Sequence, residues 1–323
     1  MKRLIQLFSL KSLLKGITYR KLISISKQYE PFIPKYLRME MLGISDNLLE
    51  LSYDDILLQN CFMDILYGYI IPCLKISNYN FNNFELGCTS LGVINNESPL
   101  IAQNFDYSLF FKSTAAFVHV ITPRLSEVFS LRLGSLLSLP IGVNNWGLSL
   151  RVNVVKTRMR GRISIPCSIL SRIALEWCQD AESFFNLQKK FGGTGPYNLL
   201  IADRDKIIAL EGLTKKIYRT DTRNYIVKTN TFTNPKFQNL LFDKEYSKFR
   251  QSYGEIRLDS LYEKKSGAIQ NRDLLQIMKD NSIICRENIF KSMTLAFLTD
   301  KYFGLGSPKE KTYGVIPLKR GEN

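Results

Sequence analysis

Hydrophobic residues change their spacing near residue 86, and this change constrains the fold more than any other feature of the sequence. Up to about residue 76 they recur at helical intervals, most clearly between Leu4 and Leu14 and between Asp54 and Leu74. After the polar tract of residues 78–83, short β-type runs follow one another with turn residues between them. The sequence therefore predicts helices first and an antiparallel sheet after them.

Helices and strands are predicted in separate blocks. Strands are expected at 86–94, 100–107, 116–122, 127–133, 147–155, 197–202, 206–212, 216–219, 225–230, 293–299 and 312–317, with a tight turn at 203–205. Helices are expected at 164–178, 181–190, 243–252, 259–264 and 271–280. Because the blocks do not alternate, an α+β domain with helices packed on sheet faces is favoured over a parallel α/β fold.

The composition excludes disordered and fibrous proteins, because 45% of the 323 residues are hydrophobic. The longest apolar stretch, residues 61–74, is broken by Asp64, Gly68 and Pro72, so no membrane-spanning helix is expected. The basic N-terminus lacks the continuous apolar core and the cleavage site of a secretory signal. Six scattered cysteines are typical of free thiols, which favours a cytoplasmic location.

Few residues are available for metal or nucleotide chemistry. His119 is the only histidine, and its β-rich surroundings favour a strand residue over a catalyst. The sequence contains no Cys-x-x-Cys pair, no clustered carboxylate motif, no P-loop and no Gly-x-Gly-x-x-Gly fingerprint. An enzyme with this sequence is therefore expected to work without a metal ion or a bound cofactor.

The net charge of +15 indicates an anionic partner. Arg158, Arg160 and Arg162 alternate, so an extended segment would project all three to one side. This basic run is interpreted either as a solvated loop or as a positive rim that attracts an anionic substrate or touches an anionic membrane. Nucleic acid is not expected as a partner, since the sequence has no recognition helix and no aromatic ribonucleoprotein motif.

A cysteine and an aspartate are predicted to meet in one hairpin. Gly87-Cys88-Thr89 precedes a turn at residues 95–98, and Asp106 follows this turn at a similar offset. Antiparallel pairing would therefore bring Asp106 back beside Cys88. Taken alone, the pattern also fits a structural cysteine buried on a strand.

Five blocks of the sequence occur in the same order in a known family. They are Gly87-Cys88-Thr89, Gln103-Asn104-Phe105-Asp106, residues 141–148, Lys228-Thr229-Asn230, and residues 282–286 leading to 292–295. Together they resemble the isopenicillin N acyltransferase (acyl-CoA:6-aminopenicillanic acid acyltransferase) family of N-terminal-nucleophile (Ntn) hydrolases, which is related to the choloylglycine hydrolases. The resemblance implies an αββα sandwich of two stacked antiparallel sheets flanked by helices.

The resemblance also implies that the chain cuts itself immediately before the cysteine. Residues 1–87 would then form a helical pro-segment and residues 88–323 a catalytic chain, within one integrated domain. Gly87 has no Cβ and can adopt the strained backbone that exposes its carbonyl to the thiol of Cys88. The freed α-amino group, with an ordinary pKa of about 7.7 to 8.0, would be a base held beside its own thiol.

Further site residues are implied by the same resemblance. Asp106 would anchor the α-ammonium group of Cys88 through charge-assisted hydrogen bonds. Asn230 would donate its amide to the oxyanion of the tetrahedral intermediate, and Asn153 would supply a second polar contact.

Three positions depart from the family pattern. Lys291 stands where acyltransferase relatives have arginine. Lysine keeps the positive charge but lacks the planar fork of a guanidinium. Either Lys291 or Arg286 would therefore support Asp106. Gln103 stands where the bile-salt relatives carry arginine, and Thr231 replaces the usual histidine. The change at Thr231 affects the expected substrate more than the nucleophile.

The sequence thus predicts an autoprocessed cysteine amidohydrolase or acyltransferase. Cys88 would attack an amide or a thioester such as an acyl-CoA, and the acyl-enzyme would pass its acyl group to water or to an amine. The alternative is a non-catalytic basic protein that keeps the fold and docks on an anionic membrane surface through residues 4–14 and the basic run.

Overall fold

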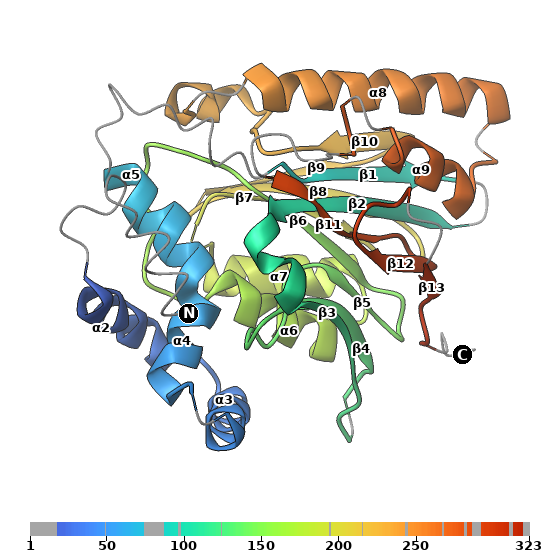
Figure 1. The fold of residues 1–323 in the computed structure, drawn as a ribbon. Coiled ribbons are helices and arrows are strands. Elements are labelled where there is room, and N and C mark those ends of the chain that lie inside the picture. Colours follow the sequence, from blue (N-terminus) through green and yellow to red (C-terminus); the bar gives the residue numbers. More distant parts are fainter. Residues whose placement is uncertain are drawn as a thin grey trace.

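Two antiparallel β-sheets lie face to face at the centre of the molecule (Figure 1). The first sheet has six strands in the order β10 (Tyr225–Lys228), β1 (Thr89–Ile94), β2 (Pro99–Ser108), β11 (Ser292–Leu298), β12 (Tyr302–Leu305) and β13 (Gly314–Val315). The second has seven strands in the order β3 (Ala115–Val120), β4 (Val128–Leu133), β5 (Gly142–Asn144), β6 (Ser149–Val154), β7 (Tyr197–Ala202), β8 (Ile207–Leu213) and β9 (Lys216–Asp221).

The structure is a computed structural model. It describes residues 18–48, 50–73, 87–95, 98–123, 125–193, 195–214, 216–242, 245–266, 268–280, 283–285, 292–309 and 313–318. The helix expected at residues 4–14, together with Arg286 and Lys291, lies outside the described residues.

Helices cover the outer faces of both sheets. The long helix α8 (Glu245–Lys265) and the short helix α9 (Asn271–Met278) pack on the six-stranded sheet. Helix α6 (Cys167–Trp177) packs on the seven-stranded sheet, with α7 (Ala181–Phe191) beside it. The predicted αββα sandwich of two stacked antiparallel sheets is confirmed.

Most boundaries lie close to their predicted positions, and the differences have physical reasons. Strands β5 and β12 are too short to produce a periodic pattern. The helices expected at 243–252 and 259–264 form one continuous helix, α8. Gly254, between the two expected helices, does not interrupt it. A Cβ at Gly254 would lie 3.0 Å from the Val227 side chain on β10, so glycine lets the helix approach the sheet.

The N-terminal helices pack against the sandwich and share its main apolar core. They are α2 (Tyr19–Tyr29), α3 (Lys35–Asn47) and α4 (Tyr53–Ile65), which continues through a π-helical turn (Leu66–Ile70) into α5 (Ile71–Cys73). The helical segment expected between Asp54 and Leu74 is confirmed, and Gly68 and Pro72 lie within the continuous helix. The continuous helix Tyr53–Cys73 is long and apolar enough to cross a membrane, but 67% of its most apolar window is buried inside the fold, as in the core helix of a globular domain.

A buried carboxylate joins α4 to the sandwich. Asp64 accepts hydrogen bonds from the hydroxyl of Tyr197 at 2.9 Å and from the backbone N–H of Cys167 at 3.1 Å. Cys167 is the first residue of α6, so the positive end of this helix dipole also stabilises the carboxylate. These hydrogen bonds join Asp64, which precedes Cys88 in the sequence, to Cys167 and Tyr197, which follow it.

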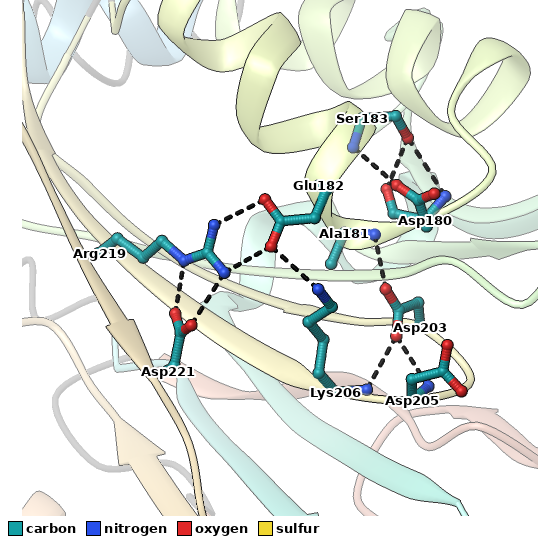
Figure 2. A network of polar contacts seen from close by, with 9 residues as sticks. All are labelled: Asp180, Ala181, Glu182, Ser183, Asp203, Asp205, Lys206, Arg219 and Asp221. Atoms are coloured by element: carbon teal, nitrogen blue, oxygen red, sulfur yellow. Dashed lines mark hydrogen bonds and ion pairs between the residues drawn. The ribbon is translucent and has the colours of Figure 1, made fainter.

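Helix α7 is held by a polar network at its N-terminus (Figure 2). Asp180 caps the helix by accepting from the backbone N–H of Ser183 at 2.7 Å. Asp203, in the predicted turn between β7 and β8, accepts from the backbone N–H of Ala181 at 2.8 Å. Hydrogen bonds from Arg219 and from a neighbouring lysine lower the pKa of Glu182 to about 2, so this exposed carboxylate remains ionised and bridges the helix to the sheet edge.

We expect Asp64→Ala to lower the free energy of unfolding by about 2 to 3 kcal/mol, because it leaves two buried donors without their acceptor. Urea denaturation in a Cys88→Ala background, which keeps the chain in one piece, measures this loss. The exposed Asp46→Ala is the control and should change stability by less than about 0.5 kcal/mol. Equal losses from the two variants would show that Asp64 does not join α4 to the sandwich.

Candidate active site

The hairpin of β1 and β2 sets the geometry around Cys88. Ile94 pairs with Pro99 and Thr89 with Asn104, so the next two pairs bring Cys88 opposite Phe105 and Gly87 opposite Asp106. This continued register places Asp106 one residue further along the chain than the residue opposite Cys88. Since side chains alternate along a strand, those of Cys88 and Asp106 project from opposite faces of the sheet, with the Gly87–Cys88 peptide between them.

Cys88 lines a small apolar cavity walled by residues of both sheets and of α4 and α6. Its side chain is 3% exposed, and the cavity wall is completed by Met63, Phe105, Tyr107, Leu139, Pro140, Val152, Val154, Cys167, Ser168 and Tyr197. A second small apolar cavity, which reaches Gln59, Phe111 and Leu136, shares four of these wall residues. Burial raises the pKa of Tyr107, and the nearby Cys88 raises it further, so the phenol stays neutral.

On the outer face, Asp106 is buried and accepts a hydrogen bond from Oγ1 of Thr294 at 2.7 Å. Thr294 pairs with Asp106 across β11 and β2, and the register then shifts at a β-bulge before Ala296. Bulges re-aim side chains, and this one lies beside the predicted site. Lys291, the predicted cationic support of Asp106, lies outside the described residues, and so does Arg286.

Asn230 connects strand β6 to helix α8 through two side-chain hydrogen bonds. Its Nδ2 donates to the carbonyl oxygen of Val154 at 2.9 Å, and its Oδ1 accepts from Nη2 of Arg250 at 2.7 Å. Val154 is a wall residue of the Cys88 cavity. The sequence-predicted residues Cys88 and Asn230 therefore lie in one neighbourhood.

Arg250 is the residue of this site that sequence reasoning missed. It projects from α8, is fully buried, and donates through Nη1 to the carbonyl oxygen of Cys88 at 2.7 Å and to Oγ1 of Thr89 at 2.9 Å. No local pattern marks it, because α8 is a largely polar helix whose buried positions are sparse. Only the three-dimensional contacts single it out.

A buried ion pair supports the loop that carries Asn230. Nζ of Lys228 lies 2.6 Å from Oε1 of Glu211, and the same carboxylate accepts from the backbone N–H of Thr233 and of Asn234 at 2.9 Å. Burial alone would raise the pKa of Glu211, but the lysine ammonium and these hydrogen bonds lower it below its usual range. The ionised carboxylate thus fixes both ends of the segment around Asn230.

Asn153 is buried on β6, where its Oδ1 accepts from the hydroxyl of Ser90 at 2.8 Å. Ser90 is the inward-facing residue that follows Cys88 along β1. Asn153 thus links the two sheets at Ser90, the next residue after Cys88 on the same face of β1.

The basic run does not form the extended segment expected from its alternation. Strand β6 ends at Val154, and the three arginines have different surroundings. Arg158 stacks on the ring of Phe242 at 5.5 Å, whereas Arg160 is exposed. Arg162 is half-buried and donates to the carbonyl oxygen of Phe191 at the end of α7 at 2.9 Å. Arg158 and Arg160 thus remain as surface cations on the segment that connects Val154 to Cys167.

Other features of the described residues lie apart from Cys88. No group of three His, Cys, Asp or Glu side chains among them could hold a metal ion. His119 is a residue of β3, as predicted, with Nε2 2.9 Å from a carboxylate oxygen of Glu127. A larger cavity of about 650 Å³ lies at the opposite end of β1 and β2, bordered by Asn95, Ser98 and the start of α9.

An αββα sandwich with this pairing of antiparallel sheets is the fold of the Ntn hydrolases, and solved structures of that class match it. The Caenorhabditis elegans N-acylethanolamine-hydrolyzing acid amidase ortholog has a TM-score of 0.50 and 14% identity, covering 71% of this chain and 100% of that chain. A cysteine-to-alanine mutant and an arginine-to-leucine variant of the Clostridium perfringens conjugated bile acid hydrolase have TM-scores of 0.50 and 0.53 and identities of 12% and 13%. Each covers 73% of this chain and 95% of its own.

The sequence assigns the chain more narrowly within this class. The family model for acyl-coenzyme A:6-aminopenicillanic acid acyl-transferase matches residues 93–299, which is more than half of the chain. The chain belongs to this family. No curated protein sequence matches it. The family and the structural neighbours are acyltransferases and amidohydrolases, which favours an enzyme over the non-catalytic alternative.

We expect Glu211→Gln to lower the free energy of unfolding at neutral pH by about 3 kcal/mol, because it leaves the buried ammonium of Lys228 without its counter-ion. The folded pKa of Glu211 lies below the ordinary value of 4.5, so its stabilising effect is complete above that pH and is lost as the pH falls through the folded pKa. The gap between the two proteins should therefore be constant above pH 4.5 and narrow below it. Urea denaturation over a pH series, again in the Cys88→Ala background, measures the gap, and a gap independent of pH would contradict the assignment.

Proposed function

We propose that this protein is a cysteine Ntn enzyme that cleaves an amide or thioester through a Cys88 acyl-enzyme. The observation that carries the proposal is the position of Cys88 at the start of β1. Its thiol faces an apolar cavity, and its carbonyl oxygen shares the guanidinium of Arg250 with Asn230. The proposed nucleophile and amide donor thus lie in one neighbourhood, beside an apolar cavity of about 20 Å³ that would have to widen to take an acyl group.

The thiol would first act on the chain itself. Sγ of Cys88 attacks the carbonyl carbon of Gly87, the C–N bond breaks, and the Gly87 acyl group moves to sulfur while the nitrogen takes up a proton. Water then hydrolyses this thioester and frees Cys88 as a new chain start. Continuing the strand register two residues beyond Thr89 places Asp106 opposite Gly87, which supports its role as the anchor of the new α-ammonium group.

The mature site would use the same groups for substrate. The α-amino group of Cys88 takes the thiol proton, and the thiolate attacks the substrate carbonyl to form a tetrahedral oxyanion. Asn230 donates an amide N–H to this oxyanion. The α-ammonium group formed in this step then protonates the leaving group, and the thioester passes its acyl group to water or to an acceptor amine.

The cavity of about 20 Å³ would have to widen to admit an acyl group, and its wall favours an apolar one, because most of its residues have aliphatic, aromatic or thioether side chains. The exposed cation Arg160 supports an anionic portion outside the cavity, as in an acyl-CoA thioester or an acidic N-acyl amide.

We further propose that Lys291 assists Asp106 and that residues 1–87 stay with the catalytic chain after cleavage. We also propose that no cofactor takes part and that the reaction occurs in the cytoplasm.

Intact-mass analysis tests the processing step. Purified wild-type protein should give two fragments that begin at Met1 and at Cys88, and Cys88→Ala should give one uncut mass. Asp106→Asn should slow the cleavage because it removes the charge beside the scissile bond, whereas the exposed Asp205→Asn should not. A single uncut wild-type mass in a protein that turns over an N-acyl amide would disprove autoprocessing.

Charge reversal tests the anionic substrate. Arg160→Glu should lower kcat/KM for an anionic N-acyl amide more than for its neutral counterpart, and added salt should shrink the difference, because exposed charges are screened over about 8 Å at physiological ionic strength. Lys264→Glu, an equal charge change at the far end of α8, is the control and should affect both substrates alike. If Arg160→Glu lowered kcat/KM equally for both substrates, the basic run would be a solvated loop without a role in substrate binding.

A further inference from the structure

A layer of polar side chains crosses the space between the two sheets, next to the level of Cys88. Each sheet contributes a row of three residues that pair directly across neighbouring strands. The rows are Lys228, Ser90 and Gln103 on the six-stranded sheet, and Asn153, Asn198 and Glu211 on the seven-stranded sheet. All six side chains are buried. Ser90 is the next residue after Cys88 on the same face of β1, so the layer lies beneath the proposed nucleophile.

Two side-chain contacts join the rows. Nζ of Lys228 lies 2.6 Å from a carboxylate oxygen of Glu211, so the two charges of the layer balance each other. The hydroxyl of Ser90 donates to Oδ1 of Asn153 at 2.8 Å. The remaining polar groups of the layer are neutral amides.

Three amide atoms of the layer have no hydrogen-bond partner among the residues that the structure describes. They are Oε1 of Gln103, Nδ2 of Asn153 and Oδ1 of Asn198, and all three residues are 0% exposed. Asn153 and Asn198 are directly paired across β6 and β7, so their side chains are neighbours. The donor of one and the acceptor of the other nevertheless do not bond to each other. Since buried polar groups are almost always hydrogen-bonded, a further group is needed between them.

The two unpartnered oxygens cannot exchange places with their NH₂ groups, because those groups are already held. Nδ2 of Asn198 donates to the carbonyl oxygens of Thr229 and Thr231 at 2.8 and 2.7 Å. Nε2 of Gln103 donates to the carbonyl oxygen of Val152. A carbonyl oxygen only accepts hydrogen bonds, so turning either amide round would break these contacts.

The amide of Asn153 has the opposite polarity. Its oxygen accepts from Ser90, so its NH₂ group remains as a donor for the oxygens of the layer. If this amide were turned round, its oxygen would join those of Gln103 and Asn198 without a donor among them. The three amides therefore offer one donor and two acceptors.

This combination selects the ligand. The NH₂ group of Asn153 disfavours a cation, and the two carbonyl oxygens disfavour an anion. A water molecule can accept from the NH₂ group and donate its two protons to the oxygens, and buried waters typically make about three hydrogen bonds. We propose that the layer binds one internal water molecule, which accepts from Asn153 and donates to Gln103 and Asn198. This site does not depend on the chemistry of Cys88.

The same chemistry accounts for Gln103, which stands where the bile-salt relatives carry arginine. A guanidinium has only donors, so arginine would remove one of the two acceptors of the water. It would also add a buried charge to a layer in which Lys228 and Glu211 already balance each other. A neutral amide at this position therefore suits the water site.

A crystal structure of the uncleaved Cys88→Ala protein, at a resolution that shows ordered water, tests the site with water itself as the probe. We expect electron density for one water oxygen within about 3.2 Å of all three amide atoms. Direct hydrogen bonds between these amides, without density between them, would overturn the proposal.

Oxygen-17 relaxation dispersion gives a second measurement in solution, because it counts the water molecules held inside a protein. In the Cys88→Ala background, Gln103→Met keeps a side chain of similar length, removes one acceptor, and should lower the count by one. Gln188→Met, at a buried glutamine of α7 outside the layer, is the matched control and should leave the count unchanged. An unchanged count in Gln103→Met, or an equal loss in the control, would contradict the assignment. The crystal structure leaves the layer unaltered, so it decides the question even if Gln103→Met fails to fold.

Discussion

The pairing of β1 with β2 is the constraint on which the rest of the site depends. The four residues between Ile94 and Pro99 fix the register, and the register sends the side chain of Cys88 inward and that of Asp106 outward. The peptide bond between Gly87 and Cys88 therefore has a thiol near one side and a carboxylate near the other. A shift of one residue in this pairing would move both side chains to the wrong faces and separate every group described around them.

The two faces of this hairpin have different surroundings, and each suits its residue. The inner face meets apolar side chains of β6, β7 and α6, which form a space free of charge around the thiol. On the outer face, groups of α8, of α9 and of the neighbouring strand β11 form hydrogen bonds with Thr89, Asn104 and Asp106 respectively. Burying a carboxylate requires such hydrogen bonds, whereas a thiol is stable among hydrocarbon groups.

The sequence predicts the parts of this site that depend on local pattern. Alternation and turn residues give the hairpin, and the motif resemblance gives Cys88, Asp106 and Asn230. The exact partner of Cys88 depends on the length of the turn at residues 95–98, which periodicity alone does not determine. Arg250 lies 162 residues from Cys88, and a contact of this separation leaves no signal in the spacing of either segment. Glu211 on β8 meets Lys228 on β10, and no local pattern marks this contact between the two sheets.

The cavity beside Cys88 has one wall residue, Met63, from the chain before Gly87 and the others from the chain after it. If the peptide bond at Gly87 is cut, any acyl group in this cavity touches two separate polypeptides. Occupancy of the cavity and association of the two polypeptides then become linked equilibria, in which each strengthens the other by the same factor. A bound acyl chain would therefore stabilise the association of the two polypeptides. Without it, the contacts of Asp64 and the shared apolar core would hold them together.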